Sequence, residues 1–222
     1  MNQVIFFDVG GTLIRLAQPV GYYYAEMAWH YGLRADALIL QEGFKRAWKS
    51  LEPRDPVAGN RIKDDKGWWR SLVLEAWSQH PRPEAFPFND YFEELYGYFA
   101  RPGIWKIFPE VEGCLSELRQ RGYRLGVLSN WDRRLRSILS GLELMDYFED
   151  CVISSEVGVE KPHLGIFQIA MERFKIEASQ AILVGDEPRF DEEGARSAGW
   201  GIRLVDRPGR DLRDVLADCL RK

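Results

Sequence analysis

Three short apolar segments, each ending in a polar residue, constrain the fold of this chain most strongly. They are residues 4–8 (VIFFD), 124–130 (RLGVLSN) and 181–186 (AILVGD). Continuous runs of branched and aromatic side chains of this length are typical of strands buried on both faces of a parallel sheet. We therefore expect three parallel core strands that carry polar groups at their carboxyl ends.

Helical patterns lie between these strands. In one segment, apolar side chains recur at steps of three and four residues, which predicts a single apolar helix face. They are Leu164, Phe167, Met171 and Phe174. A second helix, with Val111, Leu115 and Leu118 on one face, precedes residue 124, and Gly122 marks its expected end. Strand and helix thus alternate, which predicts an α/β fold with a doubly wound parallel sheet and right-handed crossovers.

The region of residues 15–103 interrupts this alternation. It is rich in aromatic residues and helical in pattern, and Pro102 and Gly103 mark the return to the sheet. We expect an inserted helical domain here and a core domain formed by residues 1–14 and 104–222. The tryptophans of the insertion are expected to fill its interior, with one or two of them left open as contacts for a substrate. They are Trp29, Trp48, Trp68, Trp69 and Trp77.

Composition and charge exclude several classes of function. The chain has 222 residues, of which 45% are hydrophobic, enough for one substantial core and a smaller second one. Its net charge of -4 provides no basic field that would attract nucleic acid. It has no apolar run near the roughly 20 residues that a membrane span requires, and its first residues do not show the pattern expected of an export signal. We expect a cytoplasmic protein without nucleic-acid or membrane partners, and none of these features sets an oligomeric state.

Polar residues at the strand ends are the candidates for a functional site. In an open parallel sheet, ligands bind beyond the carboxyl ends of the strands, where side chains from distant segments converge. The candidates supply carboxylates, a hydroxyl, an amide and a cation. They are Asp8, Ser129, Asn130, Lys161, Asp186 and Asp191.

This combination of groups fits phosphoryl transfer. A carboxylate such as Asp8 can attack phosphorus and form an aspartyl-phosphate, which divides one difficult displacement into two easier steps. A negatively charged nucleophile beside phosphate requires a compensating Mg²⁺, for which the oxygens of Asp8 and Asp186 are suitable ligands. Lys161 and the Ser129 hydroxyl would hold the phosphoryl oxygens.

Four motifs occur together in a characteristic order: DVGGTL (8–13), LSN (128–130), EKP (160–162) and GDEPRFD (185–191), with a wide first gap. In this the sequence resembles the haloacid dehalogenase-like (HAD) hydrolase superfamily over nearly its whole length. The helical insertion resembles the family only in its position and kind. The resemblance implies a Rossmann-like core with a helical cap that closes over the site.

The resemblance also implies roles for residues at the motif positions. Asp8 would be the nucleophile, and Lys161 would offset charge. Thr12, and Ser129 with Asn130, would steady a small phosphorylated substrate.

A Mg²⁺ site follows from the same resemblance. Asp8 and Asp186 would bind the ion, and Asp191 would support them. The third protein ligand in the family's phosphatases is the backbone carbonyl two residues after the nucleophile, which Gly10 can supply.

Gly10 is the one departure from the phosphatase pattern. The family's phosphatases carry an aspartate at this position, which protonates the leaving oxygen and then deprotonates the attacking water. General acid-base catalysis contributes about 10²- to 10⁴-fold in rate. The interpretation we favour is a phosphohydrolase whose substrate, such as an acyl phosphate or phosphoanhydride, has a leaving group that needs no proton.

Two alternatives remain open. The family's dehalogenases and phosphonate-cleaving enzymes also lack the second aspartate, although the acidic motif at residues 185–191 resembles a metal site that a metal-free dehalogenase does not need. The chain could instead be a catalytically weak relative that binds a phosphorylated ligand or a protein partner.

Overall fold

The computed structural model describes residues 3–51 and 64–220, except for the side chains of the last two of these. The chain forms two compact units. One consists of Met1–Arg15 with Trp105–Lys222, and the other is the continuous segment Leu16–Ile104. Residues 52–63 of the expected helical insertion lie outside the described part of the chain.

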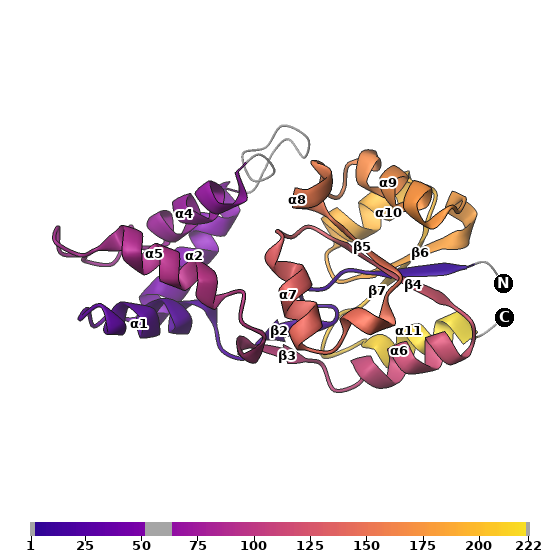
Figure 1. Ribbon diagram of the computed structural model, residues 1–222, viewed down its shortest axis with the longest axis horizontal. Helices are drawn as coiled ribbons and strands as arrows, with labels where there is room; N and C mark the ends of the chain where they lie inside the picture. Colours follow the sequence, from indigo (N-terminus) through magenta and orange to yellow (C-terminus); the bar gives the residue numbers. More distant parts are fainter. Residues whose placement is uncertain (1–2, 52–63, 221–222) are drawn as a thin grey trace. The chain divides into compact units, whose positions relative to one another are not determined.

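A five-stranded parallel sheet forms the centre of the first unit, with the strand order β5-β4-β1-β6-β7 (Figure 1). Its strands are β1 (Val4–Phe7), β4 (Arg124–Ser129), β5 (Asp150–Ile153), β6 (Ala181–Gly185) and β7 (Gly201–Leu204). The three apolar segments of the sequence are the three central strands, and the predicted α/β fold with a doubly wound, Rossmann-like parallel sheet is confirmed.

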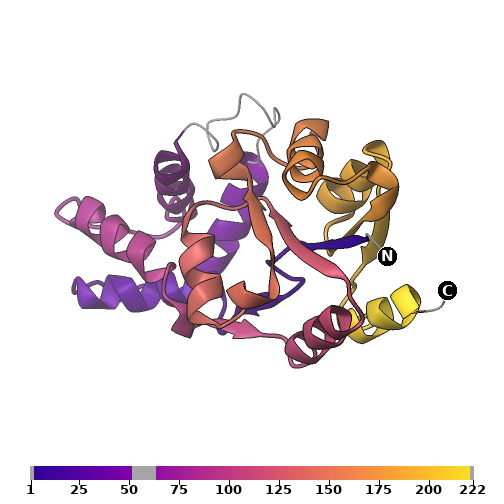
Figure 2. The ribbon, with the colours of Figure 1, turned by 45° about the vertical axis from the view of Figure 1, so that its right-hand side comes forward.

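Helices cover both faces of this sheet. Successive side chains of a strand point to opposite faces, and β1 follows this rule: Ile5 and Phe7 belong to one apolar cluster, and Val4 and Phe6 to another. The first cluster includes residues of α6 (Val111–Gln120), α7 (Arg134–Gly141) and α11 (Leu212–Leu220). The second includes residues of α9 (Leu164–Phe174) and α10 (Glu193–Ser197). Figures 1 and 2 show α6 and α11 on one side of the sheet and α9 and α10 on the other.

Short elements complete the first unit. They are β3 (Trp105–Ile107), α8 (Ser154–Val157), and the single turns η2 (Met145–Tyr147), η3 (Ala178–Gln180) and η4 (Pro188–Glu192). Strand β3 pairs with β2 (Ile14–Leu16), so the chain leaves the first unit and returns to it through a two-stranded sheet.

The two predicted helices of the first unit form, with one correction to their apolar faces. The face of α6 is as expected, and the helix ends before Gly122, which has a φ of +84°. In α9, Phe167 and Phe174 are buried and Met171 packs against the same cluster, but Leu164 is 43% exposed, so its assignment to the apolar face was wrong. Leu164 is the first residue of α9, and the stripe that packs on the sheet begins two residues later. It consists of Ile166, Phe167, Ala170 and Phe174.

The second unit is helical. Its elements are α1 (Val20–His30), α2 (Ala37–Leu51), α4 (Asp65–Ala76), α5 (Phe88–Tyr98) and the turn η1 (Pro102–Ile104). Four of its tryptophans belong to its apolar interior or pack against it, as expected: Trp48, Trp68, Trp69 and Trp77. The expectation was wrong for Trp29, which is 55% exposed and carries the guanidinium of Arg34 4.8 Å above its ring. Within the described residues, no helix combines the length and apolar character that a membrane crossing needs.

Candidate active site

The sheet topology brings three of the candidate residues to one edge. Asp8 directly follows β1, Ser129 is the last residue of β4, and Asp186 directly follows β6. Strand β1 lies between β4 and β6, and Phe7 is in register with Val127 and Val184. Because all three strands are parallel, the groups that follow them meet beyond the carboxyl edge of the sheet.

Asp8 lies at the centre of these groups, and its side chain is 13% exposed. Its Oδ1 accepts hydrogen bonds from Ser129 Oγ at 2.9 Å and from Lys161 Nζ at 2.8 Å. Among the described residues, none donates a hydrogen bond to Oδ2. One oxygen of the carboxylate is therefore fixed, whereas the other is available for a ligand or for attack on an electrophile.

Lys161 connects Asp8 to Asp191. Its side chain is only 2% exposed, and Nζ lies 2.6 Å from Asp191 Oδ1. The amide of Asn130 holds the backbone of Lys161 from both sides: its Oδ1 accepts from Lys161 N at 2.7 Å, and its Nδ2 donates to Lys161 O at 2.9 Å. Asn130 thus positions the loop that carries the lysine, and contact of this amide with a substrate stays a prediction.

Thr12 and Asp191 hold the acidic side of the site. Thr12 is fully buried, and its Oγ1 donates to Asp186 Oδ1 at 2.7 Å. Asp191, 1% exposed, uses Oδ1 for Lys161 and accepts a hydrogen bond from Glu187 N at Oδ2, at 3.0 Å. Sequence reasoning assigned Thr12 to the substrate, whereas its hydroxyl in this structure orients a carboxylate.

Residue 11, in the DVGGTL motif, must be glycine because of its backbone conformation and its closeness to Asp186. Its φ is +78°, a conformation that side chains with a Cβ rarely adopt. A Cβ at this position would also lie 2.1 Å from Asp186 Oδ2. The glycine therefore allows both the turn and the close approach of the carboxylate.

The electrostatics of the site indicate a shortage of positive charge. Burial raises the pKa of Asp8 to about 6; Lys161 opposes this shift, and Asp191 and Asp186 add to it. Burial also raises the pKa of Asp186, against the hydrogen bond from Thr12. For Lys161, burial alone would lower the pKa, but the charges of Asp191 and Asp8 outweigh it and raise the pKa, so the ammonium stays protonated.

The donor set fits a divalent cation. Oxygen atoms of Asp8, Asp186 and Asp191 all lie within 4.8 Å of one another. Neighbouring oxygen ligands of a Mg²⁺ ion, each at about 2.0–2.1 Å from it, lie about 2.9 Å apart and opposite ones about 4.2 Å apart, so these oxygens would draw closer together around a shared ion. The hydrogen bonds of the loop after Asp8, from Gly11 N to Ile14 O and from Ile14 N to Val9 O, do not use the carbonyl of Gly10.

Two further residues bear on the site and escaped sequence reasoning. The ring of Trp131, which directly follows Asn130, lies over Gly10. The guanidinium of Arg207 donates from Nη2 to Thr12 O at 3.0 Å, forms an ion pair with Glu110, and lies 3.8 Å from the centre of the Phe108 ring. The position of Trp131 beside the LSN motif was an available signal, whereas Arg207 lies outside every motif.

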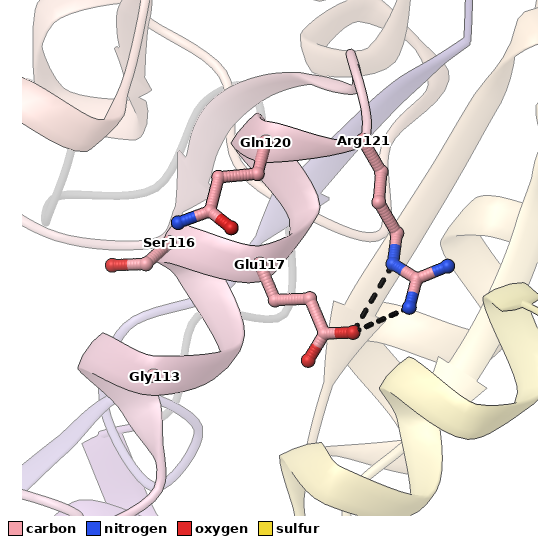
Figure 3. A pocket seen from close by; sticks show the side chains of 5 residues that line it. All are labelled: Gly113, Ser116, Glu117, Gln120 and Arg121. Atoms are coloured by element: carbon pink, nitrogen blue, oxygen red, sulfur yellow. Dashed lines mark hydrogen bonds and ion pairs between the residues drawn. The ribbon is translucent and has the colours of Figure 1, made fainter.

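A hollow on the surface of α6 is separate from these groups (Figure 3). All its lining residues lie on α6 or directly after it, and it contains the ion pair between Glu117 and Arg121 at 2.6 Å. None of the predicted site residues lines it, so it has no part in the chemistry at the strand ends. Its lining residues are Gly113, Ser116, Glu117, Gln120 and Arg121.

Comparison with known sequences defines the class of protein. Residues 3–199 match the sequence model described as "Hydrolase: haloacid dehalogenase-like hydrolase". The chain therefore belongs to the haloacid dehalogenase-like hydrolase family, as the motifs indicated.

Individual relatives agree with this assignment. The human protein named "Haloacid dehalogenase-like hydrolase domain-containing protein 3" is 34% identical over 221 residues, which cover 99% of this chain and 88% of the human one. A HAD phosphatase from Thermococcus onnurineus has a similar fold, with a TM-score of 0.63, 22% identity, and coverage of 99% of this chain and 98% of its own. L-2-haloacid dehalogenase from Xanthobacter autotrophicus also has a similar fold, with a TM-score of 0.70, 20% identity, and coverage of 93% of this chain and 78% of its own. The fold is therefore common to a phosphatase and a dehalogenase, and only the site can discriminate between the two reactions.

Proposed function

We propose that this protein is a Mg²⁺-dependent phosphohydrolase that acts on a small phosphorylated compound through an aspartyl-phosphate at Asp8. The observation that carries the proposal is the state of the Asp8 carboxylate. Lys161 and Ser129 hold one oxygen, the other has no hydrogen bond from the described residues, and two further carboxylates lie beside it.

In the first step, Asp8 Oδ2 forms a bond to phosphorus while the bond between phosphorus and the leaving oxygen breaks. Lys161 and Ser129 orient the nucleophile and are close enough to bind phosphoryl oxygens as these approach. Asp8, Asp186 and the Gly10 carbonyl would hold a Mg²⁺ ion, whose positive charge would let a phosphate group approach three carboxylates. Asp191 fixes Lys161 beside Asp8. In the second step, water attacks phosphorus, the bond from phosphorus to Asp8 Oδ2 breaks, and Asp8 is regenerated as a carboxylate while inorganic phosphate leaves carrying the protons of the water or releasing one to solvent.

Gly10 restricts the substrate. Because position 10 has no carboxylate, the leaving group departs with its electron pair and without a proton from this residue. Acyl phosphates and phosphoanhydrides, whose leaving groups are weak bases, meet this requirement. Water activation in the second step lacks the same carboxylate, so the aspartyl-phosphate should persist longer than in an enzyme that has it.

The acidic cluster favours this reaction over halide displacement. Departure of a halide requires neither a proton nor a metal ion, and a metal-free displacement has no use for Asp186 held toward Asp8 by the Thr12 hydroxyl. A phospho-ligand or protein-binding role without turnover would use the same residues but would leave no covalent adduct.

Intact-protein mass spectrometry after mixing with acetyl phosphate and Mg²⁺ tests the proposal. We expect a mass increase of one phosphoryl group in the wild type and none with EDTA or in Asp8→Asn. Absence of the adduct at every donor concentration and quench time would reject the phosphohydrolase. Halide release from a 2-haloacid in EDTA would establish the dehalogenase instead.

A further inference from the structure

The six-membered-ring edge of the Trp131 indole borders the position where a side chain on residue 10 would begin. A Cβ built on Gly10 would lie 3.1 Å from Trp131 Cζ3 and 3.8 Å from Cη2. The first distance is shorter than ordinary van der Waals contact, so a Cβ here would require the ring to shift by a few tenths of an ångström.

The backbone of Gly10 does not itself require glycine. The glycines with positive φ in this chain include its neighbour Gly11 but not Gly10. The described structure around Gly10 therefore offers one reason for the missing side chain, which is the ring above it.

Several contacts fix the position of Trp131. Its backbone N donates to Ser154 Oγ, and the same hydroxyl donates back to its carbonyl, both at 3.1 Å. The carbonyl also accepts from Ser155 N at 3.2 Å. The ring is partly buried against the apolar cluster that includes residues of α6, α7 and α11. Its centre lies 5.2 Å from the centre of the Trp105 ring. The hydrogen bonds fix the backbone of Trp131, and the packing against Trp105 and the apolar cluster restricts its ring.

We propose that Trp131 is a specificity-determining residue, which presents an aromatic face to the leaving group in the space that an acidic side chain at position 10 would need. The inference rests on the proposed function and specifies its substrate class. The preferred donor would be a phosphate ester or anhydride with a planar, unsaturated and weakly basic leaving group, such as an aryl, enol or aromatic acyl phosphate. The flat group stacks on the indole.

The first step balances without a proton at position 10. The bond from phosphorus to Asp8 Oδ2 forms, the bond from phosphorus to the leaving oxygen breaks, and that oxygen keeps the electron pair and departs as an anion. A planar, conjugated leaving group spreads this charge, whereas an alkoxide cannot. The same ring that excludes an acid thus selects the leaving groups that do not need one.

The test measures the rate of Asp8 phosphorylation in single turnovers, by rapid quench and intact-protein mass spectrometry with Mg²⁺. The donors are 4-nitrophenyl phosphate, phenyl phosphate, ethyl phosphate and acetyl phosphate, the last having a small leaving group without a ring. In the wild type, we expect the rate to fall steeply as the basicity of the leaving group rises.

Removal of the aromatic face should change preference more than overall rate. In Trp131→Leu, the ratio of the 4-nitrophenyl to the acetyl phosphate rate should fall by about 3- to 10-fold, the range expected for loss of one aromatic pair. Trp131→Phe should restore most of this ratio, and Trp29→Leu, which removes an exposed tryptophan on α1, should leave it unchanged. Should Trp131→Leu not fold, Gly10→Ala keeps the indole but displaces it, and should lower the same ratio.

A second comparison tests the competition for space. Gly10→Asp alone should gain little activity toward ethyl phosphate, because the indole prevents the carboxylate from reaching the leaving oxygen. Gly10→Asp combined with Trp131→Ala should phosphorylate from ethyl phosphate at least about 10-fold faster than Gly10→Asp, by general acid catalysis.

The outcomes separate the two proposals. If no variant forms an adduct with any donor, the phosphohydrolase is wrong and the inference fails with it. If the wild type forms the adduct but the ratio is the same in Trp131→Leu and Gly10→Ala, or if Gly10→Asp equals the double variant, the role of Trp131 is wrong while the phosphohydrolase stands.

Discussion

Lys161 Nζ and Asp191 Oδ1 lie 2.6 Å apart, with side chains that are 2% and 1% exposed. The same ammonium reaches Asp8 Oδ1 at 2.8 Å, so one buried cation joins the loop before α9, the turn after β6 and the end of β1. Burial of charge is costly unless a partner compensates it. The pair therefore links the stability of the first unit to the arrangement of its site.

Replacement of the cation should destabilise the protein strongly. Lys161→Met leaves the buried carboxylates of Asp8 and Asp191 without their counter-ion, and breaking such a pair typically costs about 3–5 kcal/mol. Urea denaturation in EDTA measures the change in the free energy of unfolding. Glu192→Gln is the matched control, because its ion pair with Arg196 is largely exposed and should contribute less than about 1 kcal/mol. Equal losses in the two variants would show that Lys161 is not compensating buried charge.

The acidic cluster should make thermal stability depend on Mg²⁺. A ligand that binds only the folded state at 100 times its dissociation constant adds about 2.7 kcal/mol to the free energy of unfolding. We therefore expect thermal scanning to give a higher unfolding midpoint with Mg²⁺ than with EDTA. Asp186→Asn should remove most of this shift, whereas Glu112→Gln, at an exposed position on α6, should retain it. A shift that survives in Asp186→Asn would place the ion elsewhere.

The need for glycine at position 11 can be divided into its two causes. Gly11→Ala combines a strained φ with the contact to Asp186, whereas Gly122→Ala has a similar φ of +84° and nothing within 4 Å of the added methyl group. Both substitutions should cost about 1 kcal/mol or more in the free energy of unfolding, since the native φ disfavours a Cβ. Only Gly11→Ala should also weaken Mg²⁺ binding, measured by titration calorimetry. Unchanged affinity would mean that the carboxylate of Asp186 adapts freely.

The sequence predicted the central part of this fold and missed its edges. Strands β1 and β6 and the interior of β4 lack charged and polar side chains because both their faces are buried, and that composition is visible in a single sequence. Strands β5 (DCVI) and β7 (GIRL) have four residues each and lie at the edges of the sheet. Short segments of mixed character carry too weak a periodic signal to be recognised without knowledge of their neighbours.

The site shows the same division between motif and geometry. Asp8 and Asp186 converge as expected, because parallel strands bring their carboxyl ends to one edge, and Lys161 reaches Asp8 from the loop before α9. The hydrogen bond from Thr12 to Asp186 and the ring of Trp131 over Gly10 depend on where individual side chains point. No spacing rule gives that direction, so sequence reasoning did not foresee the hydrogen bond from Thr12 to Asp186 and overlooked Trp131, while contact of Thr12 with a substrate stays a prediction.

Arg207 extends the site to residues that no motif contains. It donates to the carbonyl of Thr12, whose hydroxyl orients Asp186, and it lies on the Phe108 ring with an ion pair to Glu110. We therefore expect Arg207 to act as a positioning residue for the first motif. A lysine in its place keeps the charge but loses the planar group that stacks on Phe108 and reaches two acceptors at once.

Arg207→Lys should therefore slow phosphorylation of Asp8 and weaken Mg²⁺ binding together, because both depend on the position of Thr12. It should also lower the free energy of unfolding by about 1–3 kcal/mol, as the loss of a hydrogen bond to a partly buried charged group does. Arg213→Lys, at an ion pair whose arginine side chain is 75% exposed, is the control and should change neither rate nor affinity. If Arg207→Lys lowers stability while the rate and the Mg²⁺ affinity match those of the wild type, the residue stabilises the fold without positioning the site, and the path from Arg207 through Thr12 to Asp186 does not govern the chemistry.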